Sequence, residues 1–175
     1  MAMGRSDESL RSTRLVFYKE DIERIAKILN TFLKNANARC VLLVDKDGHL
    51  VTKEGESSTY DMDTISALVA GSFAATKQMA KLLGEEEFSI MFHQGKKDNI
   101  QLSLVGERTI LAVIFDDKTT LGMVRLYTSE AAKRLHSIFA EAGERKGPEP
   151  AAPFGEGFDA SAKESVDELF GKGEK

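Results

Sequence analysis

Few residues of this chain have the types and spacing that catalytic or metal chemistry requires. The three histidines, His49, His93 and His136, share no spacing typical of metal ligands, and the single cysteine, Cys40, has no CxxC partner. No Ser/His/Asp arrangement or carboxylate pair is apparent from local spacing, and pairs distant in sequence stay open. We therefore expect no catalytic residue, cofactor site or metal site, and we interpret Cys40 as a buried thiol.

Two short patterns resemble binding motifs, and two arginines could act on a partner's phosphate. Residues 95–96 resemble the end of a phosphate-binding loop, but Ile90 stands where that motif needs a glycine. The run DKDG at 45–48 has its glycine two positions too early for a calcium loop and indicates a hairpin turn instead. Arg108 and Arg125 have the chemistry of an arginine finger, although we expect both to be solvated.

Composition excludes several classes of protein. The chain has 175 residues, of which 42% are hydrophobic and 30% charged, and this fits one globular domain with tails. The formal net charge of -4 and the lack of a basic stripe argue against nucleic-acid binding. No apolar run approaches the roughly 20 residues that span a bilayer, and the first dozen residues lack the apolar segment of a signal peptide. With one cysteine, these features predict a cytoplasmic protein without a membrane partner.

The helix expected at 62–83 is the most informative element. Its only charged residues after Asp63 are Lys77 and Lys81, so it is apolar nearly all round. One stripe is expected to pack on a sheet, namely Ile65, Leu68, Val69, Ser72, Ala75, Thr76, Met79 and Leu83. The other faces then carry Ala67, Ala70, Gly71, Phe73, Ala74 and Gln78. A helix of this kind is normally covered on both sides, which favours a subunit or partner surface over a core helix of a larger sheet domain.

Hydrophobic periodicity predicts the remaining elements. A one-sided helix at 19–36 is followed by strands at 39–45, 49–54, 87–94, 99–105 and 109–116. A last helix starts at Thr120 or Ser129 and ends at Ala142. The strand 88–94 alternates apolar and mixed residues, so at a sheet edge it would aggregate unless another chain pairs with it. An internal position is the alternative; an edge position, together with the apolar helix, favours a homodimer.

The chain ends differ in composition from its centre. We expect a disordered N-terminus at 1–13, a folded domain at 14–142, a flexible proline-containing linker at 143–158 and an amphipathic C-terminal segment at 159–175. Ser161 and Glu164 form a capping-box pair in that last segment, ahead of the apolar Val166, Leu169 and Phe170.

Four stretches of the chain carry a family resemblance, namely VLLVDKDGHLV (41–51), ISALVAGSFAATKQMAKLLGE (65–85), FHQGKKD (92–98) and VIFDDKTTLGMVRL (113–126). They resemble the Roadblock/LC7 family, in particular its bacterial members that act with a small Ras-like GTPase of the MglA type. The resemblance covers residues 14–142, and the acidic tail is also similar. It implies an α/β, longin-like sandwich with a five-stranded antiparallel sheet of order 2-1-5-4-3 between one helix and two helices.

The resemblance also implies how the chain assembles and acts. The edge strand would pair with its dimer mate into one continuous sheet through Phe88, Ile90, Met91 and Phe92. The two 62–83 helices would form a GTPase-binding platform made of Thr64, Leu68, Gly71, Ala74, Ala75, Lys77, Gln78 and Lys81. The implied protein is not an enzyme; it stimulates GTP hydrolysis by positioning the partner's switch regions, in cell polarity or motility, and concentrates at a cell pole.

The C-terminal segment would have a separate role. The resemblance implies that Val166, Leu169 and Phe170 anchor the tail on the GTPase and favour nucleotide exchange. The rival hypothesis is a Roadblock scaffold that tethers a partner without changing nucleotide turnover.

Overall fold

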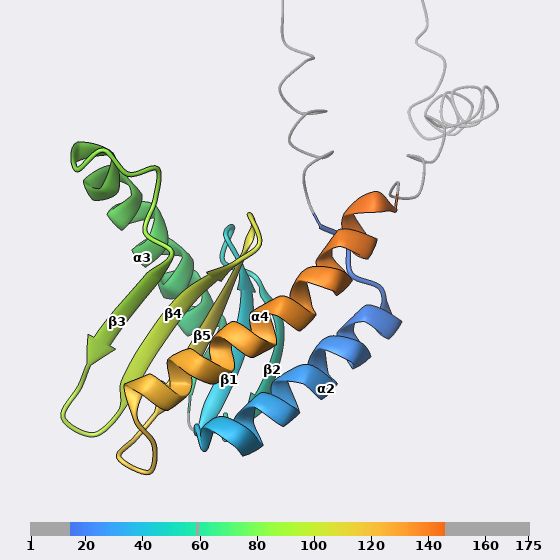
Figure 1. Ribbon diagram of the computed structural model, residues 1–175, viewed down its shortest axis with the longest axis horizontal. Helices are drawn as coiled ribbons and strands as arrows, with labels where there is room; N and C mark the ends of the chain where they lie inside the picture. Colours follow the sequence, from blue (N-terminus) through green and yellow to red (C-terminus); the bar gives the residue numbers. More distant parts are fainter. Residues whose placement is uncertain (1–14, 59, 146–175) are drawn as a thin grey trace, which may run out of the picture. The chain divides into compact units, whose positions relative to one another are not determined.

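The computed structural model describes residues 15–58 and 60–145 and contains one sheet between two helical layers (Figure 1). The elements are α2 (Lys19–Ala36), β1 (Cys40–Asp45), β2 (Leu50–Gly55), α3 (Met62–Leu82), β3 (Ile90–Gln94), β4 (Asn99–Val105), β5 (Thr109–Phe115) and α4 (Leu121–Glu144). The five strands are antiparallel in the order β2-β1-β5-β4-β3. Both the fold class and the strand order that the resemblance implied are confirmed.

The two central strands, β1 and β5, form the core because successive side chains along a strand point to opposite faces of the sheet, and a helical layer covers each face. All of β5 and all but the last residue of β1 are buried. Val41 and Leu43 join the apolar cluster beneath α2 and α4, whereas Cys40, Leu42 and Val44 join the cluster beneath α3. The sheet is therefore covered on both faces, with α3 alone on one of them (Figure 1).

The layer of α2 and α4 follows the predicted helices closely. The predicted bounds of α2 are confirmed, and Asn37, which adopts φ 52, follows the last helical residue Ala36 as its C-cap. Of the two predicted starts for α4, the earlier is confirmed, because the Thr120 hydroxyl and carbonyl accept hydrogen bonds from the first turn. The helix continues through Glu144, two residues beyond the predicted end. Among the described residues, no helix is both long and apolar enough to cross a bilayer.

The orientation of α3 corrects the expected packing stripe. Phe73 and Ala70 were expected on the outer faces, but both are buried against the sheet. Leu68, Met79 and Leu83 were expected on the sheet, but they are exposed. A helix that is apolar nearly all round gives no strong preference for one face, and here the large Phe73 ring occupies the core beside Met62 and Val69. Of the other stripe residues, Ala75 is also exposed, whereas Ile65, Ser72 and Thr76 are partly buried.

Several further boundaries differ from the sequence-based expectation, most of them by one residue. The edge strand begins at Ile90, so Phe88 precedes it and is only partly buried. The return strand of the first hairpin begins at Leu50. The predicted disordered N-terminus at 1–13, the linker from 146 onward and the segment 159–175 lie outside the described residues.

Candidate partner-binding surface

The start of α3 is fixed by an aspartate cap. The Asp61 carboxylate accepts hydrogen bonds from the Thr64 backbone N–H at 3.1 Å and from the Thr64 hydroxyl at 2.7 Å. These bonds, led by the one from the hydroxyl, hold the pKa of Asp61 below its usual value. Of the two predicted caps, Asp61 is therefore the one used, and Gly84, at φ 82, follows the helix end as predicted.

All eight residues expected to form the platform are exposed along α3. They are Thr64, Leu68, Gly71, Ala74, Ala75, Lys77, Gln78 and Lys81. Small side chains occupy the middle of this surface, and a Cβ placed on Gly71 would meet no other atom within 4 Å. The two lysines lie at its C-terminal end, where they line a hollow together with Glu85, Glu86 and Glu87, so that end carries both signs of charge. The small side chains permit close approach of another helix or backbone.

The exposed apolar side chains around this surface extend beyond the eight residues. Leu68 is 65% exposed, and Leu82 and Leu83, which were not among the expected contact residues, are 88% and 70% exposed. Met79 is also exposed. In α3, Ala80 is the one buried residue after Phe73. Sequence reasoning assigned Met79 and Leu83 to the sheet, and in a helix that is apolar nearly all round no local sequence signal separates them from the buried residues. Leu68 lies in the first half of α3, and Leu82 and Leu83 lie at its C-terminal end, so large exposed apolar side chains flank the platform residues and make this surface a candidate for binding another chain.

Among the described strands, the edge strand β3 pairs with β4 alone. The Leu104 N–H donates to the Ser89 carbonyl at 2.8 Å. Because antiparallel pairing alternates, the backbone groups of residues 91 and 93 then face β4, whereas those of Ile90 and Phe92 face outward. The Thr76 hydroxyl contacts the Met91 sulfur at 3.2 Å, which joins the edge strand to α3.

The side chains of the edge strand point to both faces of the sheet. Phe92 stacks on Phe115 with ring centroids 6.1 Å apart, beneath the α2 and α4 layer. Met91 packs in the cluster beneath α3, and Ile90 is 47% exposed. The edge strand therefore places Met91 on the face of the sheet that α3 covers and Phe92 on the opposite face, whereas Phe88 lies outside the strand. An outward row of N–H and C=O groups beside exposed apolar side chains can accept another strand.

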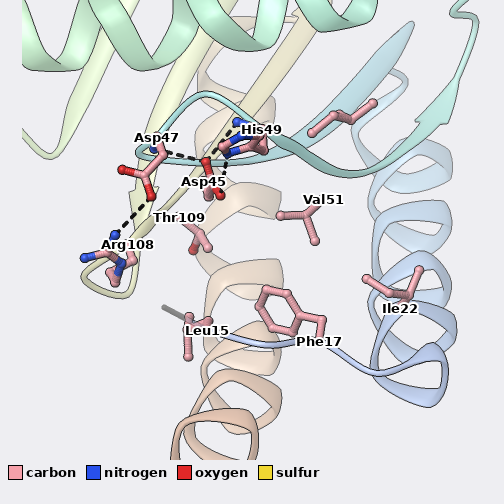
Figure 2. Close-up of a pocket in the computed structure, with 10 residues that line it drawn as sticks. Leu15, Phe17, Ile22, Asp45, Asp47, His49, Val51, Arg108 and Thr109 are labelled. Atoms are coloured by element: carbon pink, nitrogen blue, oxygen red, sulfur yellow. Dashed lines mark hydrogen bonds and ion pairs between the residues drawn. The ribbon is translucent and has the colours of Figure 1, made fainter. Parts of the chain in front are cut away.

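A separate cavity of about 210 Å³ lies where the β1–β2 turn meets the β4–β5 turn (Figure 2). Its floor is apolar, and its rim carries a histidine–carboxylate contact and an arginine–carboxylate ion pair. His49 Nδ1 lies 3.3 Å from Asp45 Oδ2, and the Arg108 guanidinium lies 3.3 Å from Asp47 Oδ2. The cavity is smaller than the range of about 300–1,000 Å³ typical of small-molecule sites. These rim side chains contact one another, and the Arg108–Asp47 pair joins the two turns.

The other residues considered for chemistry are dispersed. Arg125 is exposed on α4, on the opposite face of the sheet from α3. His93 and His136 are exposed on β3 and α4, and within residues 15–58 and 60–145 no three His, Cys, Asp or Glu side chains are placed to hold a metal ion. Cys40 is buried as predicted, and burial raises the pKa of its thiol. The tail residues Val166, Leu169 and Phe170 lie outside the described part of the chain.

Comparison with known proteins agrees with this geometry. The Roadblock/LC7 domain matches residues 24–115. MglB of Myxococcus xanthus is 40% identical, with a TM-score of 0.70 over 76% of this chain and 100% of that one. The gliding protein MglB of Thermus thermophilus is 35% identical, with a TM-score of 0.68 over 73% and 96%. An MglB solved in a tetrameric arrangement is 35% identical, with a TM-score of 0.70 over the same shares. The chain belongs to the Roadblock/LC7 family.

Proposed function

We propose that this protein is a homodimeric regulator of an MglA-like small GTPase of the Ras family and that it stimulates GTP hydrolysis by that partner. The observation that carries the proposal is the exposed α3 surface beside the outward edge of β3. Similarity to MglB at 40% identity supports the partner class. In the proposed dimer the two β3 edges pair, so the two α3 helices come together on one face as a single platform.

The physical case for the dimer rests on two features that are costly for a monomer. The edge of β3 presents outward backbone groups, and α3 presents Leu68, Met79, Leu82 and Leu83 to water. Burying apolar surface contributes roughly 25 cal/mol per Å², and pairing the edge satisfies the outward N–H and C=O groups. Both are achieved by one two-fold interface. The relative solved in a tetrameric arrangement supports self-association of this fold.

The proposed mechanism is positional. A Ras-like GTPase hydrolyses GTP slowly until its switch loops and an arginine are correctly placed around the γ-phosphate. Small residues at Gly71, Ala74 and Ala75 allow the partner's switch region to approach α3 closely, so binding energy holds the switch loops in the arrangement needed for hydrolysis. Neither Arg108, which is paired with Asp47, nor Arg125, which lies on the opposite face, is placed beside this surface. The arginine that stabilises the transition state is then the partner's own.

The tail has a proposed second role. The amphipathic sequence 161–170 would dock on the GTPase away from the platform and favour release of GDP. The proposed setting is the cytoplasm, with concentration at a cell pole, in a process of cell polarity or motility.

The alternative is a scaffold that binds the same partner without changing its turnover. The test is to combine the protein with an MglA-like GTPase from the same organism, measure the affinity by calorimetry and measure phosphate release in a single turnover. We expect binding together with roughly tenfold or greater acceleration of hydrolysis. Binding at an unchanged hydrolysis rate would establish the scaffold, and no binding would reject both.

A further inference from the structure

The turn between β1 and β2, residues 45–49, approaches the middle of α3 closely. At Gly48, which has φ 95, an added Cβ would lie 3.2 Å from the Ala67 Cα and 3.7 Å from the Ala70 Cβ. Any other residue there would be disfavoured both by its backbone conformation and by lack of space. Contact between this turn and α3 therefore depends on a glycine facing two alanines.

The same turn is tied to the connection that follows α3. The Lys46 ammonium donates to both carboxylate oxygens of Glu87, at 3.0 and 2.9 Å, and both side chains are 25% exposed. Glu87 lies between the end of α3 at Leu82 and the start of β3 at Ile90. This pair therefore attaches the turn to the segment that joins the α3 surface to the dimer edge.

The turn itself is held rigidly on its other side, where it borders the cavity (Figure 2). Asp45 Oδ1 accepts hydrogen bonds from the backbone N–H groups of Asp47 at 3.0 Å and His49 at 2.8 Å. The Lys46 backbone N–H donates to the Arg108 carbonyl at 2.9 Å, and the Arg108 guanidinium pairs with Asp47. Movement of the turn would therefore require several bonds to change together.

We infer that residues 45–49 are a positioning element that sets where α3 lies relative to the β3 edge. The turn contacts α3 at Ala67 and Ala70, and through Lys46 it binds Glu87 in the segment that follows α3. Between these points, Ala80 is the one buried residue of α3 after Phe73, and Thr76 contacts Met91 of β3 at 3.2 Å, so few contacts besides those of the turn hold this half of the helix on the sheet. The inference rests on the proposed function where it concerns the GTPase, because the restrained half carries Lys77, Gln78 and Lys81.

The first test compares two partly exposed ion pairs. Lys46→Gln removes the pair with Glu87, and Arg24→Gln removes the pair with Glu141 that joins α2 to α4 on the other face of the sheet. In hydrogen exchange on the full chain without a GTPase, we expect amides 74–82 to exchange about threefold to tenfold faster in Lys46→Gln only. The charge-swapped variant, Lys46→Glu with Glu87→Lys, should restore wild-type exchange. Equal exchange of these amides in the two single variants would overturn the inference.

The second test uses two turn glycines with positive φ. Gly48→Ala presses on α3, whereas Gly106→Ala, at φ 68 in the β4–β5 turn, meets only the Phe139 ring at 3.4 Å. At saturating GTPase, stimulation of hydrolysis should fall roughly tenfold more in Gly48→Ala than in Gly106→Ala. Equal effects would contradict positioning by the turn. If the wild-type protein does not stimulate hydrolysis, the proposed function fails, while the exchange result still decides the inference.

Discussion

Replacing Ile90 by proline should weaken the dimer without unfolding the subunit. Ile90 is the first residue of β3, and the Ser89 bond to Leu104 implies that its N–H points away from β4. A proline there removes an outward donor and is tolerated at a strand's first residue. Because a two-fold interface contains both copies, Ile90→Pro would remove two intermolecular hydrogen bonds. At about 0.5–1.5 kcal/mol each, the loss is about 1–3 kcal/mol, or roughly a 5- to 150-fold rise in the dimer Kd.

The assay for this prediction is sedimentation equilibrium over a range of protein concentrations. Ile90→Ala is the matched control, because it shortens the same side chain and keeps the N–H. Met91→Pro removes an N–H that faces β4, so the midpoint temperature of its thermal unfolding should be well below that of Ile90→Pro. The reasoning is refuted if Ile90→Pro and Ile90→Ala dimerise equally well, because the edge of β3 would then not be the interface.

Three further changes test other parts of the account. Ala74→Arg should lower the affinity for the GTPase at least 100-fold in calorimetry while sedimentation still reports a dimer. The reason is that an unpaired charge in a packed contact costs several kcal/mol. Retained affinity would place the partner site elsewhere. Deleting residues 148–175, or replacing Leu169 and Phe170 by alanine, should leave hydrolysis stimulated but slow release of fluorescent GDP, and identical release rates would reject the exchange role of the tail. Burial raises the pKa of the Cys40 thiol. The contribution of this thiol to the free energy of unfolding is therefore fully present below the ordinary thiol pKa of about 8.5 and is lost as the pH rises through the raised pKa. The free energy of unfolding of Cys40→Ala, measured with denaturant, should therefore depend less on pH above about 8.5 than that of the wild-type protein. Parallel pH profiles of the two proteins would count against ionisation of Cys40 as the cause.

Elements with strong periodicity were predictable from the sequence alone. The bounds of α2 follow from one apolar stripe on an otherwise charged helix, and β5 is central because all of it is apolar enough to face both layers. The family resemblance supplied the strand order, which the structure confirms. The helix and strand positions depend on neighbours in sequence, so a single chain is sufficient to identify them, whereas the strand order needed the resemblance.

The rotation of α3 was not predictable, for a physical reason. Apolar residues surround this helix, so its sequence favours several faces almost equally, and the sheet selects Phe73 rather than Leu68. The positioning turn was predicted only as a hairpin. Its contacts with Ala67, Glu87 and Arg108 join segments far apart in the chain, and no local pattern encodes them. The platform residues came from the resemblance, and their role stays a prediction.

The measurement that tests the central claim most directly is single-turnover GTP hydrolysis by the MglA-like GTPase, with wild-type protein and with Ile90→Pro at increasing concentrations. If the dimeric platform accelerates hydrolysis, stimulation by Ile90→Pro should be lost below its raised dimer Kd and return above it, while the wild-type protein stimulates throughout. Equal stimulation by the two proteins when Ile90→Pro is monomeric would contradict the dimeric platform. No stimulation by either, with the complex formed, would contradict the regulatory role itself.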